Sequence, residues 1–208
     1  MAETEGVIKF NLHYEASPVE SSHALDELLH WRDVFFRLGV IGQDPARYGG
    51  YAYGNISYRL GSANRFVISG SQTGGLEECG AEHYSIVDVC KVETNRVEAR
   101  GPIAPSSESL THGAIYALSE DIRCVVHGHA PLLWKNTEVL EIPATSREVE
   151  YGTPQMAQAI ETLYRDQGSP ALALFSMLGH EDGIIAYGKG FAVIEALWHE
   201  YTRRAKSL

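Results

Sequence analysis

A pair of histidines one residue apart, His127 and His129, is the feature that most constrains how this chain folds and what it binds. The preceding residues 122–126 read Ile-Arg-Cys-Val-Val and are rich in β-branched side chains, which favours a strand. Side chains two residues apart on a strand point to the same face, so the two imidazoles are expected side by side. Neutral imidazole binds zinc, iron, copper and nickel. The pair is therefore half of a metal site or, alternatively, two partly exposed polar residues at a strand end.

Two further residues can complete such a metal site. Glu108 precedes the pair by one expected helix and one expected strand, and His180 stands before the apolar run of residues 183–187. Three histidines and a carboxylate make a catalytic metal site with a position left open for substrate. Glu108 has a second interpretation, because a carboxylate in the first turn of a helix also interacts favourably with the helix dipole.

Three segments have the composition of an anion-binding pocket. Gly54 lets the backbone approach a ligand and Asn55 offers a donor and an acceptor, although the pair also fits a simple turn. Residues 69–75 form a loop of small and hydroxyl side chains whose N–H groups can converge on an anion, without the lysine of a nucleotide-binding loop. Ser106 and Ser107 open an expected helix, where unpaired N–H groups bind phosphate, and Ser106 is equally suited as an N-cap.

Length and charge limit the class of protein. The 208 residues suit one domain with a single sizeable core. A formal net charge of -10 argues against a broad nucleic-acid or anionic-membrane surface, but an anionic small molecule can still bind through local dipoles and a metal. The cysteines at positions 79, 90 and 124 show no paired spacing, which indicates reduced thiols in a cytoplasmic protein. The acidic start is no signal peptide, and no apolar run is long enough to cross a bilayer.

The order of helices and strands predicts an α/β fold. Residues 1–20 lack a clear period and are expected to form an arm that can pack on a neighbouring subunit, while 21–208 form a single domain. Because several strands come as hairpins, the sheet should be mixed and partly antiparallel, with helices on both faces. Helices are expected at 21–39, 107–119, 132–136, 153–166 and 191–205, and strands at 54–60, 66–68, 84–90, 96–99, 122–129, 139–143, 171–178 and 183–187.

Several motifs in a fixed order resemble the class II aldolase/adducin family. They are Gly-Asn-Ile-Ser-Tyr-Arg at 54–59, Pro-Ser-Ser-Glu at 105–108 with Thr111, His112 and Tyr116 behind it, and Val-Val-His-Gly-His-Ala-Pro at 125–131. The resemblance spans roughly Leu25 to Ala205. The family includes fuculose-phosphate aldolase, ribulose-phosphate 4-epimerase, a dehydratase and the non-catalytic head domain of adducin. It implies a three-layer α/β/α fold with a mixed, largely antiparallel central sheet, and commonly a homotetramer with active sites between subunits.

The resemblance also implies roles for single residues. His127, His129 and His180 would hold one divalent metal ion per subunit, Zn²⁺ in the first place and Mn²⁺, Co²⁺ or Fe²⁺ as alternatives, with Glu108 as the catalytic acid and base. The phosphate-binding residues would be Gly54, Asn55, Ser71, Thr73, Gly74, Ser106 and Ser107. The loop at 69–75 is about two residues longer than in related aldolases, so Ser71 and Thr73 both remain candidates for one contact. Relatives usually carry His-Gly where this chain inserts Glu181 and Asp182, whose carboxylates could support a ligand histidine.

These roles predict an aldolase. A divalent cation would act as a Lewis acid on a ketose carbonyl and stabilise the enediolate left when the adjacent carbon–carbon bond breaks. The products would be dihydroxyacetone phosphate and an aldehyde. Two rival reactions use the same site, namely 4-epimerisation of a pentulose phosphate and dehydration of a thio-sugar phosphate. A non-catalytic adducin-like interaction domain is a further alternative, which the presence of Glu108, His127, His129 and His180 disfavours.

Overall fold

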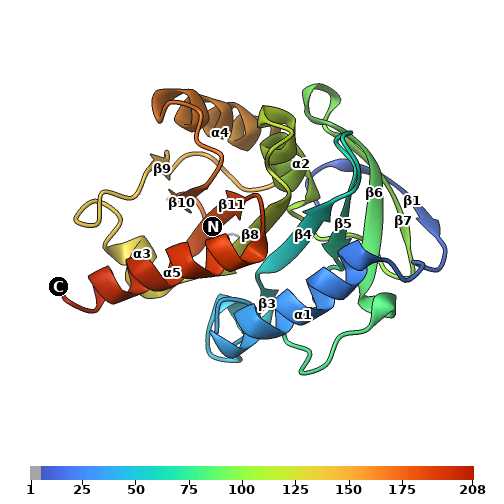
Figure 1. The fold of residues 1–208 in the computed structure, drawn as a ribbon, viewed down its shortest axis with the longest axis horizontal. Helices are drawn as coiled ribbons and strands as arrows, with labels where there is room; N and C mark the ends of the chain where they lie inside the picture. The colour runs from blue at the N-terminus through green and yellow to red at the C-terminus, as the bar shows by residue number, and fades with distance from the viewer. Residues whose placement is uncertain (1–5) are drawn as a thin grey trace.

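The fold is built on one large central sheet (Figure 1). The computed structural model describes residues 6–208. The nine strands of the sheet are β1 (Asn11–Ala16), β4 (Asn55–Arg59), β5 (Phe66–Ser69), β6 (Tyr84–Lys91), β7 (Arg96–Gly101), β8 (Cys124–His129), β9 (Ala144–Thr145), β10 (Ala173–Met177) and β11 (Gly183–Gly188). They lie in the order β1-β7-β6-β5-β4-β8-β11-β10-β9. Two short strands, β2 (Gly42–Gln43) and β3 (Ala52–Tyr53), pair separately.

The central sheet is mixed and largely antiparallel, as predicted. Only its two edge pairs, β1 with β7 and β9 with β10, run parallel among the described strands. The hairpin of β6 and β7 turns at Asn95, whose φ of 50° is the left-handed conformation that asparagine tolerates. The strand β8 lies between β4 and β11 at the centre of the sheet, so both of its histidines are surrounded by protein.

Helices cover both faces of the sheet, which gives the predicted α/β/α layers (Figure 1). They are α1 (His23–Arg37), α2 (Ser109–Leu118), α3 (Pro131–Lys135), α4 (Pro154–Asp166) and α5 (Phe191–Ala205), with single 3₁₀ turns at Tyr48–Gly50, Ala81–His83 and Val92–Thr94. One core lies under α1, α3 and α5, and a second lies under α2 and α4. None of the helices in residues 6–208 is both long and apolar enough to cross a membrane.

Successive residues of the central strands serve the two cores in turn. Val126 packs in the core under α1 and α5, whereas its neighbour Val125 packs in the core under α2 and α4. Ile184 and Ile185 on β11 divide in the same way. This alternation follows from the two-residue period of a strand, and it explains why β8 and β11 are apolar on both faces.

The ends of three helices follow the predicted signals. The hydroxyl of Ser22 accepts a hydrogen bond from the Leu25 N–H and caps α1, and Thr153 caps α4 through the Met156 N–H. Gly39, with φ of 70°, follows the C-terminus of α1 in the left-handed conformation that favours glycine. The last helix begins at Phe191 and ends at Ala205, as its sequence predicts.

Three local predictions differ from the structure. Helix α2 begins at Ser109 with Glu108 at the N-cap position, so Ser106 does not cap it. Residues 139–143 are not a strand, because Leu140 and Glu141 bond back to residues 136 and 138 in successive turns. Residues 11–16 of the expected arm form β1 on this chain's own sheet, and residues 1–5 of that arm lie outside the described residues.

Candidate active site

Three histidines from two parts of the sheet converge on one point. His127 and His129 lie on β8, and His180 lies in the turn between β10 and β11, where its N–H bonds to the Met177 carbonyl. One nitrogen of each ring can be chosen so that all three lie within 4.8 Å of one another. The Nε2 atoms of His129 and His180 are 3.3 Å apart. Two ligands of a tetrahedral zinc ion, each at 2.0–2.1 Å, are about 3.3–3.4 Å apart, so this pair is already at coordinating separation.

The surroundings of the three rings suit a metal ligand. His127, His129 and His180 are 1%, 3% and 2% exposed. Burial, and then the neighbouring His180 and His129, hold the pKa of His127 well below its usual range. The ring is therefore neutral at physiological pH, which is the form that binds a metal ion. Its Nε2 is buried and faces the carboxylate of Glu108, so a cation held by this ring would lie beside an acidic group.

Glu108 presents a carboxylate to the same point. Its Oε1 lies 3.0 Å from Nε2 of His127 and 3.7 Å from Nε2 of His180, and the residue is 2% exposed. The backbone holds it there, because the Ser106 N–H bonds to the Ser69 carbonyl and the Ser106 hydroxyl accepts from the Glu108 N–H. A carboxylate so close to three imidazoles can bind the cation itself or exchange a proton with a substrate at the open position.

The residues that follow His180 support a neighbouring ligand and are not part of the three-histidine group. The buried carboxylate of Asp182 accepts from the hydroxyl of Tyr48 at 2.6 Å and pairs with Arg47. The Tyr48 ring meets His129 edge-on at 4.4 Å. Burial, with the hydrogen bond to Asp182, raises the pKa of Tyr48. Glu181 is exposed and lies 3.8 Å from Arg47.

Two tyrosines missed by the sequence analysis fix the ring of His129. Tyr53 stacks on it at 4.9 Å with an interplanar angle of 24°, and Tyr48 packs against its edge. Both belong to the aromatic run at 48–53 that leads into Gly54. The sequence feature that could have indicated them is the high density of aromatic residues before the Gly-Asn pair. The sequence does not indicate that this run contacts β8.

Most of the expected phosphate-binding residues line one small cavity beside Glu108, of about 20 Å³. Gly54 must be glycine there, because its φ is 78° and a Cβ would lie 3.0 Å from the Val40 carbonyl oxygen. Thr73 does not line the cavity, since its hydroxyl donates to the Gly70 carbonyl within its own loop. The residues lining the cavity are Gly6, Ala52, Gly54, Asn55, Gly70, Ser71, Gln72, Gly74, Ser106, Ser107 and Glu108.

A buried arginine, also unforeseen from the sequence, supports the loop of this cavity from behind. Arg32 on α1 is 2% exposed, and its guanidinium donates to the backbone carbonyls of Thr73, Gly74, Leu76 and Glu77. The positive charge lies behind the loop that carries Ser71 and Gly74. It therefore fixes the loop and adds positive potential to an anion site that no basic side chain lines among the described residues.

A further buried histidine, His112, lies behind Glu108 on α2. Nδ1 of His112 is 2.6 Å from the hydroxyl of Ser57, which lies 2.8 Å from the hydroxyl of Tyr116. Burial lowers the pKa of His112 to about 3, so this ring is neutral in the folded protein. The row of three polar groups joins α2 to β4 and holds the helix that carries Glu108.

The chain belongs to the class II aldolase/adducin family. Residues 46–208 match the family described as "Class II Aldolase and Adducin N-terminal domain". A methylthioribulose-1-phosphate dehydratase from Xanthomonas euvesicatoria pv. vesicatoria is 32% identical over 114 residues, which are 54% of this chain and 46% of that protein. The match thus spans about half of the length of this curated relative.

Solved structures share the fold at low sequence identity. An L-fuculose 1-phosphate aldolase superposes with a TM-score of 0.63 at 17% identity, covering 90% of this chain and 87% of the other. YgbL from Klebsiella pneumoniae gives a TM-score of 0.63 at 18% identity, covering 89% and 87%. These similarities establish the architecture, and the chemistry rests on the side chains described above.

Proposed function

We propose that this protein cleaves a phosphorylated ketose reversibly to dihydroxyacetone phosphate and an aldehyde. The observation that carries the proposal is the position of the Glu108 carboxylate, 3.0 Å from His127 in a buried group of three histidines. The family supports a metal-dependent enzyme that acts on a sugar phosphate. Zinc is the proposed metal, because three imidazoles with one open position are a typical catalytic zinc site.

The proposed site has two ends, one that holds the metal and one that binds the substrate phosphate. His127, His129 and His180 would hold a divalent cation, which, when bound, polarises the substrate carbonyl and offsets the negative charge that develops on it. Glu108 delivers a proton to the carbon that the departing aldehyde leaves, and removes it in the reverse direction. Ser106, with the other residues of the small cavity, orients the substrate by its phosphate.

Dehydration of a sugar phosphate is the second candidate. It is supported by the 32% identity to a protein named methylthioribulose-1-phosphate dehydratase. Dehydration requires the same polarised carbonyl and the same proton transfer at the neighbouring carbon, so the metal end of the site would serve both reactions. The difference lies at the far end of the substrate, where a hydroxyl leaves in one reaction and an aldehyde in the other.

A panel of ketose phosphates, each incubated with and without a chelator, tests the proposal. Release of triose phosphate identifies an aldolase, loss of water a dehydratase, and an inverted stereocentre an epimerase. A protein that takes up no divalent ion would contradict all three. Light scattering on the eluting protein tests the accompanying proposal of a homotetramer, and fractionation of the cells tests its place in the cytoplasm.

Replacing Glu108 by glutamine tests the proton-transfer role. The amide has the size of the carboxylate and cannot act as a base, so we expect turnover to fall by about 10²–10⁴-fold while the bound metal is retained. Metal content by mass spectrometry and turnover of the accepted substrate are measured on the same sample. Glu195 on α5, only partly buried and paired with His199, offers a matched control. Retained turnover in Glu108→Gln would remove this residue from the mechanism.

A further inference from the structure

The cavity proposed for the substrate phosphate is narrow in this structure. Its volume of about 20 Å³ is close to the space that a single water molecule requires. A phosphate group, with a phosphorus and four oxygens, needs more enclosed space than one water molecule. If the cavity binds phosphate, as the proposed function requires, some part of its lining has to move. The residues that can move without disturbing the sheet are the ones that cover it, Gly6 and Gln72.

The side-chain amide of Gln72 lies against Gly6. It stands at the tip of the loop at 69–75 with φ of 60°, a left-handed conformation that is costly for a residue other than glycine. Its Oε1 accepts from the Ala52 N–H at 3.0 Å, so its Nε2 is the group left to donate into the cavity. A Cβ built on Gly6 would collide with this Nε2. Gly6 therefore covers the amide of Gln72 in close contact.

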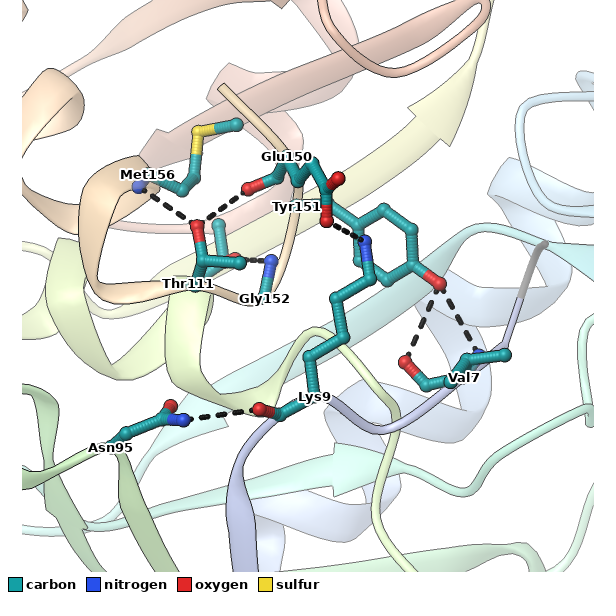
Figure 2. A network of polar contacts seen from close by, with 9 residues as sticks. Val7, Lys9, Asn95, Thr111, Glu150, Tyr151, Gly152 and Met156 are labelled. Atoms are coloured by element: carbon teal, nitrogen blue, oxygen red, sulfur yellow. Dashed lines mark hydrogen bonds and ion pairs between the residues drawn. The ribbon is translucent and has the colours of Figure 1, made fainter. Parts of the chain in front are cut away.

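The segment that carries Gly6 is held by polar contacts at Val7 and Lys9 and by Ile8, which packs against the core under α2 and α4. Figure 2 shows the hydroxyl of Tyr151 bridging the backbone of Val7, accepting from its N–H at 3.2 Å and donating to its carbonyl at 3.4 Å. Lys9 lies 3.9 Å from the centre of the Tyr151 ring and pairs with Glu150 at 3.1 Å. Polar contacts that are partly open to solvent, such as those of Val7 and Lys9, form and break readily.

The same tyrosine links the cover to the metal end of the site. The Tyr151 ring packs on His180 at 4.7 Å between ring centres. The next residue, Gly152, accepts no side chain, because a Cβ there would lie 2.8 Å from the Ser107 carbonyl oxygen, and its N–H bonds to the Thr111 hydroxyl. Movement of residues 6–9 therefore breaks two hydrogen bonds of a tyrosine whose ring packs on His180 and whose neighbour Gly152 packs on Ser107.

We propose that Gln72 is a phosphate-binding residue of this protein and that residues 6–9 form a removable cover over its amide. In the closed form Gly6 lies against Nε2 of Gln72. In the open form that Nε2 donates to the substrate phosphate. The two states exclude one another, so the closed form lowers the apparent affinity for phosphate in proportion to its population.

Inorganic phosphate is the probe, and its dissociation constant is measured by calorimetry on the zinc-loaded protein. Gln72→Glu keeps an acceptor for the Ala52 N–H and replaces the donor by a negative charge, so we expect binding to weaken about tenfold or more. Gln155→Glu adds the same charge at an exposed site on α4 and should leave the constant unchanged. Gln72→Asn tolerates the left-handed backbone and shortens the amide, and it should weaken phosphate in the same direction.

Opening the cover should have the opposite effect. Gly6→Ala is incompatible with the close contact between Gly6 and Nε2 of Gln72, and we expect phosphate to bind about fivefold more tightly. Gly61→Ala is the matched control, since Gly61 has φ of 64° and open space around it. Tyr151→Phe, which removes both hydroxyl bonds to Val7 and keeps the ring on His180, should tighten binding as Gly6→Ala does. A constant unchanged in Gln72→Glu, or unchanged or weaker in both opening variants, overturns the proposal.

These results are independent of turnover. If the protein converts no ketose phosphate but shows both shifts in phosphate affinity, the covered phosphate site is supported and the proposed reaction is wrong. If the protein releases triose phosphate but its phosphate affinity does not change with substitutions at Gln72 and Gly6, the reaction is supported and the proposed cover is wrong.

Discussion

Replacing Arg32 by methionine should destabilise the protein and weaken phosphate binding, although Arg32 does not line the cavity. Its guanidinium donates to the Gly74 carbonyl at 2.9 Å and the Thr73 carbonyl at 3.2 Å, and it also bonds to the Leu76 carbonyl. Hydrogen bonds from a charged group contribute about 1.5–3 kcal/mol each, from which the cost of burying the guanidinium, several kcal/mol, is subtracted. Methionine has a similar length and leaves the carbonyls without their donor. Each buried carbonyl left without a donor costs about 1–3 kcal/mol, so we expect a net loss of about 3–5 kcal/mol.

This loss is large against the total stability of a domain, about 5–15 kcal/mol, and urea denaturation measures it directly. Arg37→Met is the matched control on the same helix. Arg37 is 73% exposed in its side chain and pairs with Asp33 one turn away, so its replacement should cost no more than about 0.5 kcal/mol. Phosphate affinity is then titrated at a urea concentration where both variants are folded. Equal stability of the two variants would refute the role of Arg32 as the support of the loop.

Two further predictions concern buried histidines. His127→Ala should weaken zinc binding by more than about 100-fold, measured by competition with a chelating dye. The control His199→Ala, on the exposed side of α5, should leave zinc binding unchanged. Equal zinc affinities of the two variants would contradict the proposed metal site. The pKa of His112 is about 3 against an ordinary value of 6.5, so its contribution to stability is present above pH 6.5 and is lost as the pH falls towards 3. Wild type should therefore lose about 2 kcal/mol more than His112→Asn between pH 7 and pH 5 in urea denaturation, and equal losses would refute this assignment.

The parts of the fold with a strong local period were predictable from the sequence. Helix α5 begins and ends where its apolar period and flanking glycines place it, and Ser22 and Thr153 cap their helices as expected. The failure at residues 139–143 has a physical reason. Leu140 and Ile142 are buried as a strand would have them, but turns that include Glu141 at φ of 54° supply their backbone bonds. Alternating apolar residues predict which side chains are buried. They do not predict whether the backbone N–H and C=O groups bond to a neighbouring strand or within a turn.

The site was predictable only in part, for a related reason. The metal group combined a local signal, His127 and His129 on one strand, with His180, which was a candidate from its place before an apolar run and which the family resemblance supported. Arg32 contacts backbone carbonyls more than 40 residues away. Every residue has such a carbonyl, so the sequence does not indicate which ones accept from Arg32. Gln72 and Gly6 are likewise brought together by the sheet. Contacts of this kind depend on the whole fold, so the sequence contains no local pattern for them.

The arrangement of charge explains how a chain of net charge -10 can hold an anionic substrate. Among the described residues that line the small cavity, Glu108 is the one with an ionisable side chain. A divalent cation held by the three histidines would turn the local charge from negative to positive, and Arg32 with the N-terminus of α2 would add to it. The metal and the phosphate therefore favour one another, and this coupling is reciprocal. If the proposed function holds, this protein would bind its substrate firmly only with the cation in place, so its affinity and its chemistry would depend on the same three imidazoles.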